Sequence, residues 1–498
     1  MHDWQQHVLG VSQPRTKKDM ADPKGYMKVA RKEGGYRPLA ERVEDYSEVE
    51  QTLGDADRQL QASRCMDCGV PFCHWACPLG NKNPEWQDAA WRGDWAMAYD
   101  ILHSTNNFPE FTGRICPALC EKSCVLAQND EAVTCRENEC SIAEHAFALG
   151  IVKPRIPAER TGKKVAVIGG GPAGMACADM LNQAGHSVTL FEKANAVGGL
   201  LRYGIPDFKL SKKVIDRRLQ VMQAEGITFK TGAEVGVNVK LDKLRKEFDA
   251  IVVTIGAGLP RDLKVEGREL KGVHFALEFL QQQNHVNRGE AVKDADRILA
   301  TGKPVLVIGG GDTGSDCVGT SNRQKARSVM QIEIMPKPSE TRLPNNPWPY
   351  WPNVLRTSSS HKEGCDRRWC LSTKRFIGEN GQVKKVELVE VEWKKGDDGR
   401  WQMTEKPETT FTVDAELVLL CMGFLSPVHE GLVNELGVEL DARGNIKVDA
   451  SGMTSVPGVF AAGDAATGAS LVVRAIARGR ETARGVHEWL KAQASEKK

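Results

Sequence analysis

Apolar and polar positions follow two different patterns along the chain, and the change comes near residue 160. From Lys163 onward, short apolar runs end in glycines and are followed by segments with helical spacing. This order is typical of strand–helix–strand units built around a parallel sheet. The apolar run at residues 165–168, which precedes three glycines, returns at residues 305–308, again before three glycines. The internal repeat predicts two nucleotide-binding units in one chain.

The first 155 residues lack β-rich runs and are predicted to form turns and helices. Trp86, Ala90 and Ala98, for example, recur at helical spacing in the stretch that starts near residue 85. A linker with two prolines at residues 152–157 ends this region, because closely spaced prolines disfavour a continuing helix. We therefore expect a mainly helical N-terminal domain at residues 1–155.

The first glycine-rich loop follows a predicted strand, precedes a predicted helix and matches the pattern G-x-G-x-x-G. Its candidate binding residues are Gly169, Gly171, Pro172, Ala173 and Gly174. The first glycine permits a tight turn, the second admits a pyrophosphate beside the N–H groups of a helix N-terminus, and the third lets helix and strand pack closely. Glu192 ends the next predicted strand, where a carboxylate can accept hydrogen bonds from a ribose.

The second loop repeats this arrangement, and Glu333 ends the strand that follows it. Its candidate binding residues are Gly309, Gly311, Asp312, Thr313 and Gly314. One chain is therefore expected to hold two dinucleotides.

A segment near the C-terminus indicates which loop holds which dinucleotide. It is an apolar run that ends in Gly463 and Asp464, before a helix predicted to start near Leu471. The carboxylate suits a polyol chain and the helix N-terminus suits an electron-rich ring edge, as the ribityl chain and ring of a flavin require. By chain order the first loop pairs with this segment and binds FAD, which makes the second unit an inserted NAD(P)H domain. The expected boundaries are 156–259 with 424–498 for the FAD-binding domain and 260–423 for the NAD(P)H-binding domain.

Charge and hydropathy exclude several partners. The formal net charge is only +2 and no long block of one sign occurs, so nucleic acid is not an expected partner. The first 20 residues lack the apolar core of a signal peptide, and no stretch approaches the ~20 apolar residues that span a bilayer. No membrane association is expected, and a cytoplasmic location is favoured.

Nine of the 14 cysteines fall between Cys65 and Cys140. Such clustering in a reducing compartment indicates metal ligands rather than disulfides. Two runs have spacings that can hold an iron–sulfur cube, whereas zinc sites usually come as paired C-x2-4-C knuckles. The runs are Cys65, Cys68, Cys73 and Cys77, and then Cys116, Cys120 and Cys124. The scattered cysteines are expected to be buried apolar residues; they are Cys177, Cys317, Cys365, Cys370 and Cys421.

A further glycine-rich segment makes a family resemblance specific. Residues 197–206 lie between the two loops and include Gly198, Gly199, Leu200 and Arg202 as candidate FAD contacts. With both loops and the Gly463-Asp464 pair, this segment resembles the flavin reductase unit of glutamate synthase small subunits, a module shared with dihydropyrimidine dehydrogenase. The resemblance includes the cysteine-rich region and spans nearly the whole chain. It implies an α/β fold of two Rossmann-like domains, arranged as in glutathione reductase, behind a helical iron–sulfur domain.

The resemblance also implies a function. A member of this family oxidises NAD(P)H, reduces FAD and passes electrons through two 4Fe-4S clusters to a large subunit that contains FMN and iron–sulfur and makes L-glutamate from L-glutamine and 2-oxoglutarate. Hydride transfer between stacked cofactors needs positioning rather than an acid or base, so no catalytic side chain is expected. The alternatives are a reductase that serves ferredoxin, a sulfur compound or a pyrimidine-reducing partner, and an assembly scaffold.

Two details stay open at this level. By resemblance, one cluster is held by Cys65, Cys68, Cys73 and Cys124, and the other by Cys77, Cys116, Cys120 and Glu139. Relatives carry an acidic or amide residue at the position of Glu139, but Cys135 and Cys140 stand beside it here, and either thiolate could replace it as the fourth ligand.

The second open detail is the choice between NADH and NADPH. Glu333 suits the ribose 2′-hydroxyl of NADH and repels the 2′-phosphate of NADPH. Many bacterial relatives nevertheless use NADPH, often with arginines near this position. The nearest basic residues along the chain are Lys337 and Arg342, next to a Pro- and Trp-rich loop at residues 343–352.

Overall fold

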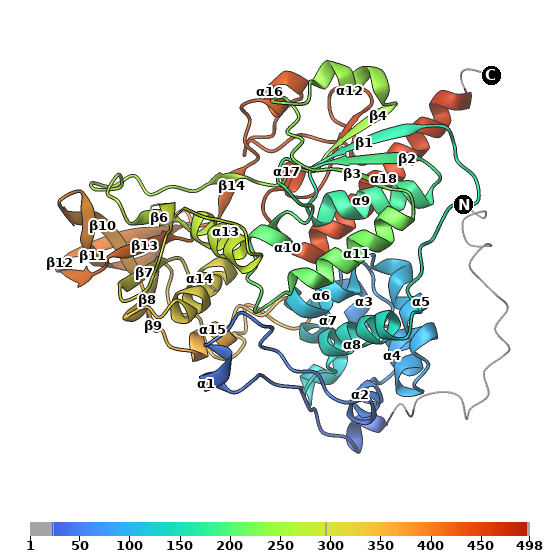
Figure 1. Cartoon of the computed structure of the whole chain (residues 1–498). Coiled ribbons are helices and arrows are strands. Elements are labelled where there is room, and N and C mark those ends of the chain that lie inside the picture. The colour runs from blue at the N-terminus through green and yellow to red at the C-terminus, as the bar shows by residue number, and fades with distance from the viewer. Residues whose placement is uncertain (1–21, 23, 294–295, 496–498) are drawn as a thin grey trace.

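The computed structural model describes residues 22, 24–293 and 296–495. Its three parts are a helical N-terminal region, a parallel sheet that combines middle and C-terminal segments, and a second parallel sheet built from the residues between them (Figure 1). The predicted fold class, α/β with two Rossmann-like units behind a helical domain, is confirmed. None of the helices in these residues is both long and apolar enough to cross a membrane.

The N-terminal region consists of short helices around an apolar core that includes Trp86, Leu102 and Ile142. The helical spacing near residue 85 belongs to two helices, because the chain turns at Gly93 with a positive φ of 74°. The elements are η1 (Gly25–Met27), α1 (Leu39–Arg42), α2 (Asp55–Ala62), α3 (Phe72–Ala76), α4 (Asn83–Trp91), α5 (Trp95–Thr105), α6 (Pro109–Ile115), α7 (Leu119–Lys122), η2 (Val125–Gln128) and α8 (Cys135–Ala148).

The first parallel sheet has the strand order β15-β4-β1-β2-β3. Its strands are β1 (Lys164–Ile168), β2 (Ser187–Phe191), β3 (Thr228–Lys230), β4 (Ala250–Val253) and β15 (Val459–Ala461). The C-terminal helix α18 (Val472–Ser495) packs along α9 (Pro172–Gln183), so the two ends of this unit meet at the first loop. The other helices are α10 (Leu200–Tyr203), α11 (Lys212–Ala224), α12 (Leu241–Glu247), α16 (Leu432–Leu436) and α17 (Asp464–Thr467).

The second parallel sheet has the order β6-β13-β7-β8-β9 and repeats the strand–loop–helix start of the first. Buried Val307 and Leu419 lie at its centre. Its strands are β6 (Val273–Phe275), β7 (Pro304–Ile308), β8 (Ser328–Glu333), β9 (Asp366–Trp369) and β13 (Leu417–Leu420), and its helices are α13 (Ala276–Asn287), α14 (Asp312–Arg323) and α15 (Ser359–Lys362).

Two features were not anticipated from the sequence. An antiparallel sheet of β10 (Leu371–Glu379), β11 (Gln382–Lys395) and β12 (Trp401–Asp414) extends the second unit. A short antiparallel pair of β5 (Leu259–Pro260) and β14 (Phe424–Ser426) carries the chain between the two parallel sheets. The predicted boundaries at 259/260 and 423/424 fall in this pair, and the division into domains stays a prediction.

The N-terminal region contacts both sheet units. Arg42 at the end of α1 donates to the carbonyl oxygen of Ser359 at 2.9 Å and forms an ion pair with Glu363 at 2.9 Å, so α1 lies beside α15 (Figure 1). The N–H group of Val49 donates to the carbonyl oxygen of Phe208 at 2.9 Å. These contacts join the start of the N-terminal region to both sheet units.

Candidate functional site: two dinucleotide loops and two groups of cysteines

The first loop turns sharply between β1 and α9. A Cβ added at Gly174 would lie 2.0 Å from the carbonyl oxygen of Gly169, so helix and strand are in close contact there, as predicted for the third glycine. Gly171 instead faces open space, with only the Cα of Gly199 as near as 4.0 Å. The loop therefore leaves room beside its second glycine, where a pyrophosphate would lie at the N-terminus of α9.

The segment from Gly198 to Arg202 folds over this loop. A Cβ at Gly199 would lie 2.7 Å from the Cα of Gly171, and the N–H group of Gly198 donates to the carbonyl oxygen of Gly170 at 2.9 Å. Leu200 is exposed. Arg202 is fully buried, and it donates to the carbonyl oxygen of Val197 at 2.6 Å and to Asp216 at 2.5 Å. Its guanidinium therefore fixes the path of this segment, and a direct contact of Arg202 with FAD stays a prediction.

Glu192 lies directly after β2, against the first loop. Its buried carboxylate accepts hydrogen bonds from the N–H groups of Gly170 at 2.7 Å and Ala194 at 2.8 Å. An ionised carboxylate has about four acceptor positions, so two stay available for ribose hydroxyl groups. Glu192 is thus placed where the loop-plus-acid pattern requires it.

The C-terminal segment meets the first loop at Gly463. A Cβ at Gly463, whose φ is +66°, would lie 2.6 Å from the Cβ of Ala173. Asp464 follows at once, its carboxylate accepting a hydrogen bond from the Ser470 hydroxyl at 2.8 Å, and burial raises the pKa of Asp464 above its ordinary value. Leu471 directly precedes α18. The structure thus brings Asp464 and the start of α18 to the loop that the chain order assigned to FAD.

The second loop has the same geometry. A Cβ at Gly310 would lie 1.7 Å from a carboxylate oxygen of Glu333, while a Cβ at Gly311 would meet nothing within 4 Å. Burial raises the pKa of Glu333, and the positive charge of Arg367 opposes that rise. Asp312 and Thr313 form the first turn of α14, and Gly314 packs against the carbonyl oxygen of Gly309. The loop therefore also has a free space at its second glycine.

The basic group that faces Glu333 is one that the sequence did not single out. Arg367 lies on β9, which pairs in parallel with β8, and it donates to the carbonyl oxygen of Arg356 at 3.0 Å. Its guanidinium lies over the ring of Trp369 at 5.0 Å, and the ammonium group of Lys337 lies over the same ring at 5.6 Å. Nothing local in the sequence indicated that β9 would lie beside β8.

Arg342 is directed away from the second loop. It donates to the carbonyl oxygens of Tyr350 at 2.7 Å and Lys122 at 3.1 Å, and therefore ties the Pro- and Trp-rich loop to the N-terminal region. Of the two basic residues suggested by proximity in sequence, Lys337 is the one near Arg367.

The first group of cysteines surrounds a cavity in the N-terminal region. The cavity is lined by Cys65, Cys68, Cys73 and Cys124, together with Cys135 and apolar side chains such as Phe72 and Val133. Burial raises the pKa of Cys65 to about 12, and the pKa values of Cys68, Cys73 and Cys124 rise for the same reason. Bound iron would offset this cost, because only thiolates ligate metal.

The four cysteines that line the first cavity fit an iron–sulfur cluster. Among the residues that the structure describes, no three His, Cys, Asp or Glu side chains come close enough to hold one metal ion. Four thiols around one cavity are the donor set that a cube held at its corners needs.

The second group combines three cysteines with Glu139. Burial raises the pKa of Cys116, and the charges of Cys120, Glu139 and Cys77 add to this rise, so the four groups face one another. They come from different elements: Cys77 follows α3, Cys116 follows α6, Cys120 lies in α7 and Glu139 lies in α8.

The surroundings of Glu139 differ from those of its two rivals. Its buried carboxylate accepts hydrogen bonds from Thr112 and, at 2.9 Å, from Asn106, and burial raises its pKa to about 7. Cys140 lies near Arg114 and Glu144 instead, and burial raises its pKa to about 11. Cys135 lines the first cavity, where Gln87 donates to its sulfur at 3.8 Å, and its thiol also hydrogen-bonds with that of Cys120. Glu139 therefore lies near Cys77 and Cys116, whereas Cys135 contacts Cys120, and the identity of the fourth ligand stays a prediction.

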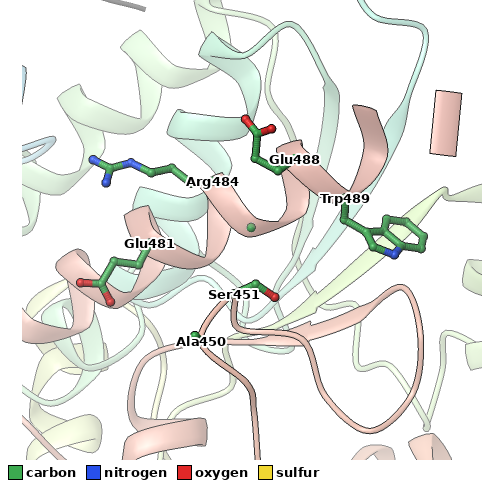
Figure 2. Close-up of a pocket in the computed structure, with 7 residues that line it drawn as sticks. Ala450, Ser451, Glu481, Arg484, Glu488 and Trp489 are labelled. Atoms are coloured by element: carbon green, nitrogen blue, oxygen red, sulfur yellow. The ribbon is translucent and has the colours of Figure 1, made fainter. Parts of the chain in front are cut away.

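A shallow hollow elsewhere on the surface contains none of these residues. It lies between α18 and residues 450–451, where a Cβ at Gly485 would come within 2.0 Å of the carbonyl oxygen of Ser451 (Figure 2). Glu481, Arg484 and Glu488 leave α18 in different directions rather than converge on the hollow (Figure 2). It is not part of the candidate site.

Comparisons with known proteins agree with this geometry. Residues 163–479 match the family model of pyridine nucleotide-disulphide oxidoreductases, and residues 42–151 match that of dihydropyrimidine dehydrogenase domain II with its 4Fe-4S cluster. The solved structure of FprA from Mycobacterium tuberculosis in complex with NADPH superposes on 67% of this chain and 86% of its own, with a TM-score of 0.54. At 16% sequence identity, that likeness shows the fold alone.

Relatives with curated names match over nearly the whole chain. The glutamate synthase (NADPH) small chain of Mycobacterium tuberculosis is 48% identical over 475 residues, which cover 95% of this chain and 96% of the relative. The glutamate synthase (NADH) of Schizosaccharomyces pombe is 45% identical over 93% of this chain, but the match spans only 22% of that longer protein. The chain belongs to the family of glutamate synthase small chains, and it is an NAD(P)H-dependent oxidoreductase with FAD and 4Fe-4S clusters.

Proposed function

We propose that this chain is the electron-input subunit of a glutamate synthase. It oxidises NAD(P)H and passes the electrons to a larger subunit, which makes L-glutamate from L-glutamine and 2-oxoglutarate. The observation that carries this proposal is the presence of two dinucleotide loops and two facing groups of cysteines in one chain. The length match with small chains, and the 22% share of the fission-yeast protein, support a separate large partner.

The residues around the first loop would hold FAD. Gly171 leaves room for the pyrophosphate, Glu192 offers acceptors to the ribose, and Asp464 offers a carboxylate to the ribityl chain. Because Gly198 and Gly199 have no side chains, their backbone lies close to the loop, and the flat ring of the flavin could pack against it. The start of α18 after Leu471 would face the ring with its N–H groups, which suits an electron-rich edge.

The residues around the second loop would hold NAD(P)H. Gly311 leaves space for its pyrophosphate at the N-terminus of α14, and Glu333 and Arg367 face the position of a ribose after β8. Hydride transfer would require nicotinamide and flavin to stack, so the side chains would supply orientation rather than proton transfer. When bound, FAD accepts a hydride and returns its electrons singly to iron–sulfur clusters, which carry one electron each.

The two groups of cysteines would hold these clusters. We assign the first to Cys65, Cys68, Cys73 and Cys124, and the second to Cys77, Cys116, Cys120 and Glu139. The enclosed cavity supports the first assignment, and the facing of Glu139 with Cys77 and Cys116 supports the second. A carboxylate ligand in place of a thiolate would change the potential of the second cluster.

The partner is expected to carry FMN and iron–sulfur, and both proteins would work in the cytoplasm. The test is to express this chain alone and together with the large subunit of its own organism. The chain alone should oxidise NAD(P)H with ferricyanide and make no glutamate, whereas the complex should form L-glutamate from L-glutamine and 2-oxoglutarate. Glutamate formation that does not need this chain would contradict the proposal.

A further inference from the structure

Four exposed apolar side chains form a patch where the N-terminal region meets the second sheet unit. Val70 and Trp75 belong to the segment around α3 and are 73% and 61% exposed. Leu343 and Tyr350 belong to the Pro- and Trp-rich loop and are 50% and 58% exposed. The rings of Trp75 and Tyr350 meet edge to face with their centroids 6.1 Å apart, so the two segments share one surface. We call these four residues the aromatic patch.

The aromatic patch lies directly over the first group of cysteines. Phe72 lines the cavity of that group, and its ring packs against Trp75 with centroids 6.4 Å apart and against Trp348 with centroids 4.6 Å apart. Cys68, a wall of the same cavity, is flanked by exposed Asp67 and Gly69. A continuous set of aromatic rings therefore connects the cavity with the surface.

Two members of the second group, Cys77 and Cys116, lie on the inner side, toward the first sheet unit, while Cys120 lies beside Cys135 at the first cavity. Leu79, two residues after Cys77, and Ile115, directly before Cys116, pack against the hydrophobic core of the first sheet unit. An electron from the flavin site would thus reach the second group first, and the first group is the one beneath the surface. The end of the electron path and the aromatic patch coincide.

Single exposed apolar residues are common on protein surfaces and need no explanation. These four differ because they are contributed by two separate segments, which meet through Trp75 and Tyr350 and lie over a candidate redox centre. Tryptophan and tyrosine are also the residue types that most often dominate the binding energy of protein interfaces.

We propose that the aromatic patch is the docking surface for the electron-accepting large subunit. The inference rests on the proposed function. For each NAD(P)H oxidised, two electrons leave this chain one at a time beneath Trp75 and reduce an iron–sulfur centre of the large subunit, and the proton of the hydride is released to water. The occupant is a protein with a complementary apolar surface, because the four side chains of the patch are apolar and two of them are aromatic.

The test compares variants of the patch with matched variants elsewhere. Trp75→Ala and Tyr350→Ala are measured against Trp401→Ala, because Trp401 on β12 is 60% exposed, and Val70→Glu is measured against Val237→Glu, because Val237 is 71% exposed. The readout is the Kd between the cofactor-loaded chain and its large subunit. The patch variants should bind at least tenfold more weakly, whereas the matched variants should bind as the unchanged chain does.

Two further readouts keep the test decisive. Iron content and ferricyanide reduction by NAD(P)H should stay unchanged in all five variants, and glutamate formation should fall only in the patch variants. If Trp75→Ala loses iron because α3 also carries Cys73, Tyr350→Ala decides, since the loop at residues 343–352 contains no cysteine. Binding by both alanine variants within twofold of Trp401→Ala would overturn the docking surface alone. An unchanged chain that does not bind the large subunit would overturn the proposed function and this inference together.

Discussion

Glu110 on α6 and Arg218 on α11 form an ion pair inside the contact between the cysteine-rich region and the first sheet unit. The guanidinium donates to the two carboxylate oxygens at 2.5 and 3.0 Å, and both side chains are almost completely buried. Tyr99 accepts a further hydrogen bond from Arg218 at 3.3 Å. Because Cys116 directly follows α6, this pair fixes the second group of cysteines against the flavin unit.

Removing one partner of this ion pair should destabilise the protein strongly. Arg218→Leu leaves the Glu110 carboxylate buried without a counter-charge, which typically costs about 3–5 kcal/mol. The double variant Arg218→Leu, Glu110→Leu should recover most of that loss, because no charge then stays buried. The apparent free energy of unfolding in urea measures both effects. Arg375→Leu, which breaks a more exposed pair with Glu387, is the control and should change stability by about 1 kcal/mol or less. Equal losses in the single and double variants would contradict this account.

Cys73→Ser should remove the first cluster and leave the second. Cys73 lines the first cavity, and a serine hydroxyl at neutral pH is a much poorer iron ligand than a thiolate. About half of the iron per chain should be lost, whereas FAD content should stay unchanged. Cys365→Ser is the control, because Cys365 lies beside β9 and far in sequence from both groups. Full iron content in purified Cys73→Ser would show that Cys73 is a free thiol and not an iron ligand.

Glu139→Ala and Cys140→Ser should differ in iron content although the two residues are neighbours. Glu139 lies near Cys77 and Cys116, so its loss should remove the second cluster. The iron content per chain should then fall by about half. Cys140 lies beside Arg114, so serine there should keep both clusters. If Cys140→Ser loses iron and Glu139→Ala keeps it, the thiolate is the fourth ligand.

The two loops, the acids at the ends of β2 and β8, and the parallel sheets could be predicted because each is a local pattern with a steric reason. The contacts that could not be predicted are those between elements far apart in the sequence. Arg367 faces Glu333 only because β9 joins the sheet beside β8, and no local signal predicts that neighbour. Arg202 stands in a motif that resembles a flavin contact, yet its guanidinium is taken up by Val197 and Asp216 inside the chain. The sequence left Glu139 and Cys140 open because adjacent residues on a helix point in different directions and the packing around α8 is set by tertiary structure, so the fourth ligand stays a prediction.

Gly171→Asp and Asp464→Ala should weaken FAD binding to different degrees. An aspartate at position 171 would fill the space beside the loop and add like charge next to a pyrophosphate, so flavin should be absent from the purified protein. Asp464→Ala removes one charged hydrogen bond, worth about 1.5–3 kcal/mol, which corresponds to a Kd roughly 10- to 150-fold higher. Flavin fluorescence titration of the apoprotein measures both. Gly54→Asp, directly before α2, is the control for added charge, because a side chain at Gly54 meets nothing within 4 Å. An unchanged flavin Kd in Asp464→Ala would show that Asp464 does not bind FAD and only forms a turn with Ser470.

Glu333 and Arg367 should set the preference between NADH and NADPH in opposite directions. Glu333 lies against the second loop, where a carboxylate accepts a hydrogen bond from the 2′-hydroxyl of NADH and repels the 2′-phosphate of NADPH. Glu333→Ala should therefore raise the ratio of kcat/KM for NADPH over NADH by about tenfold, which corresponds to about 1.4 kcal/mol.

Arg367→Ala should lower the same ratio, because the positive charge that faces Glu333 would also attract a 2′-phosphate. Arg342→Ala should leave the ratio unchanged, since Arg342 binds the carbonyl oxygens of Tyr350 and Lys122. Initial rates of ferricyanide reduction with each nucleotide give the ratio without the partner subunit. A ratio that is flat or falls in Glu333→Ala would remove Glu333 from the nucleotide site and leave Arg367 and Lys337 to determine the preference.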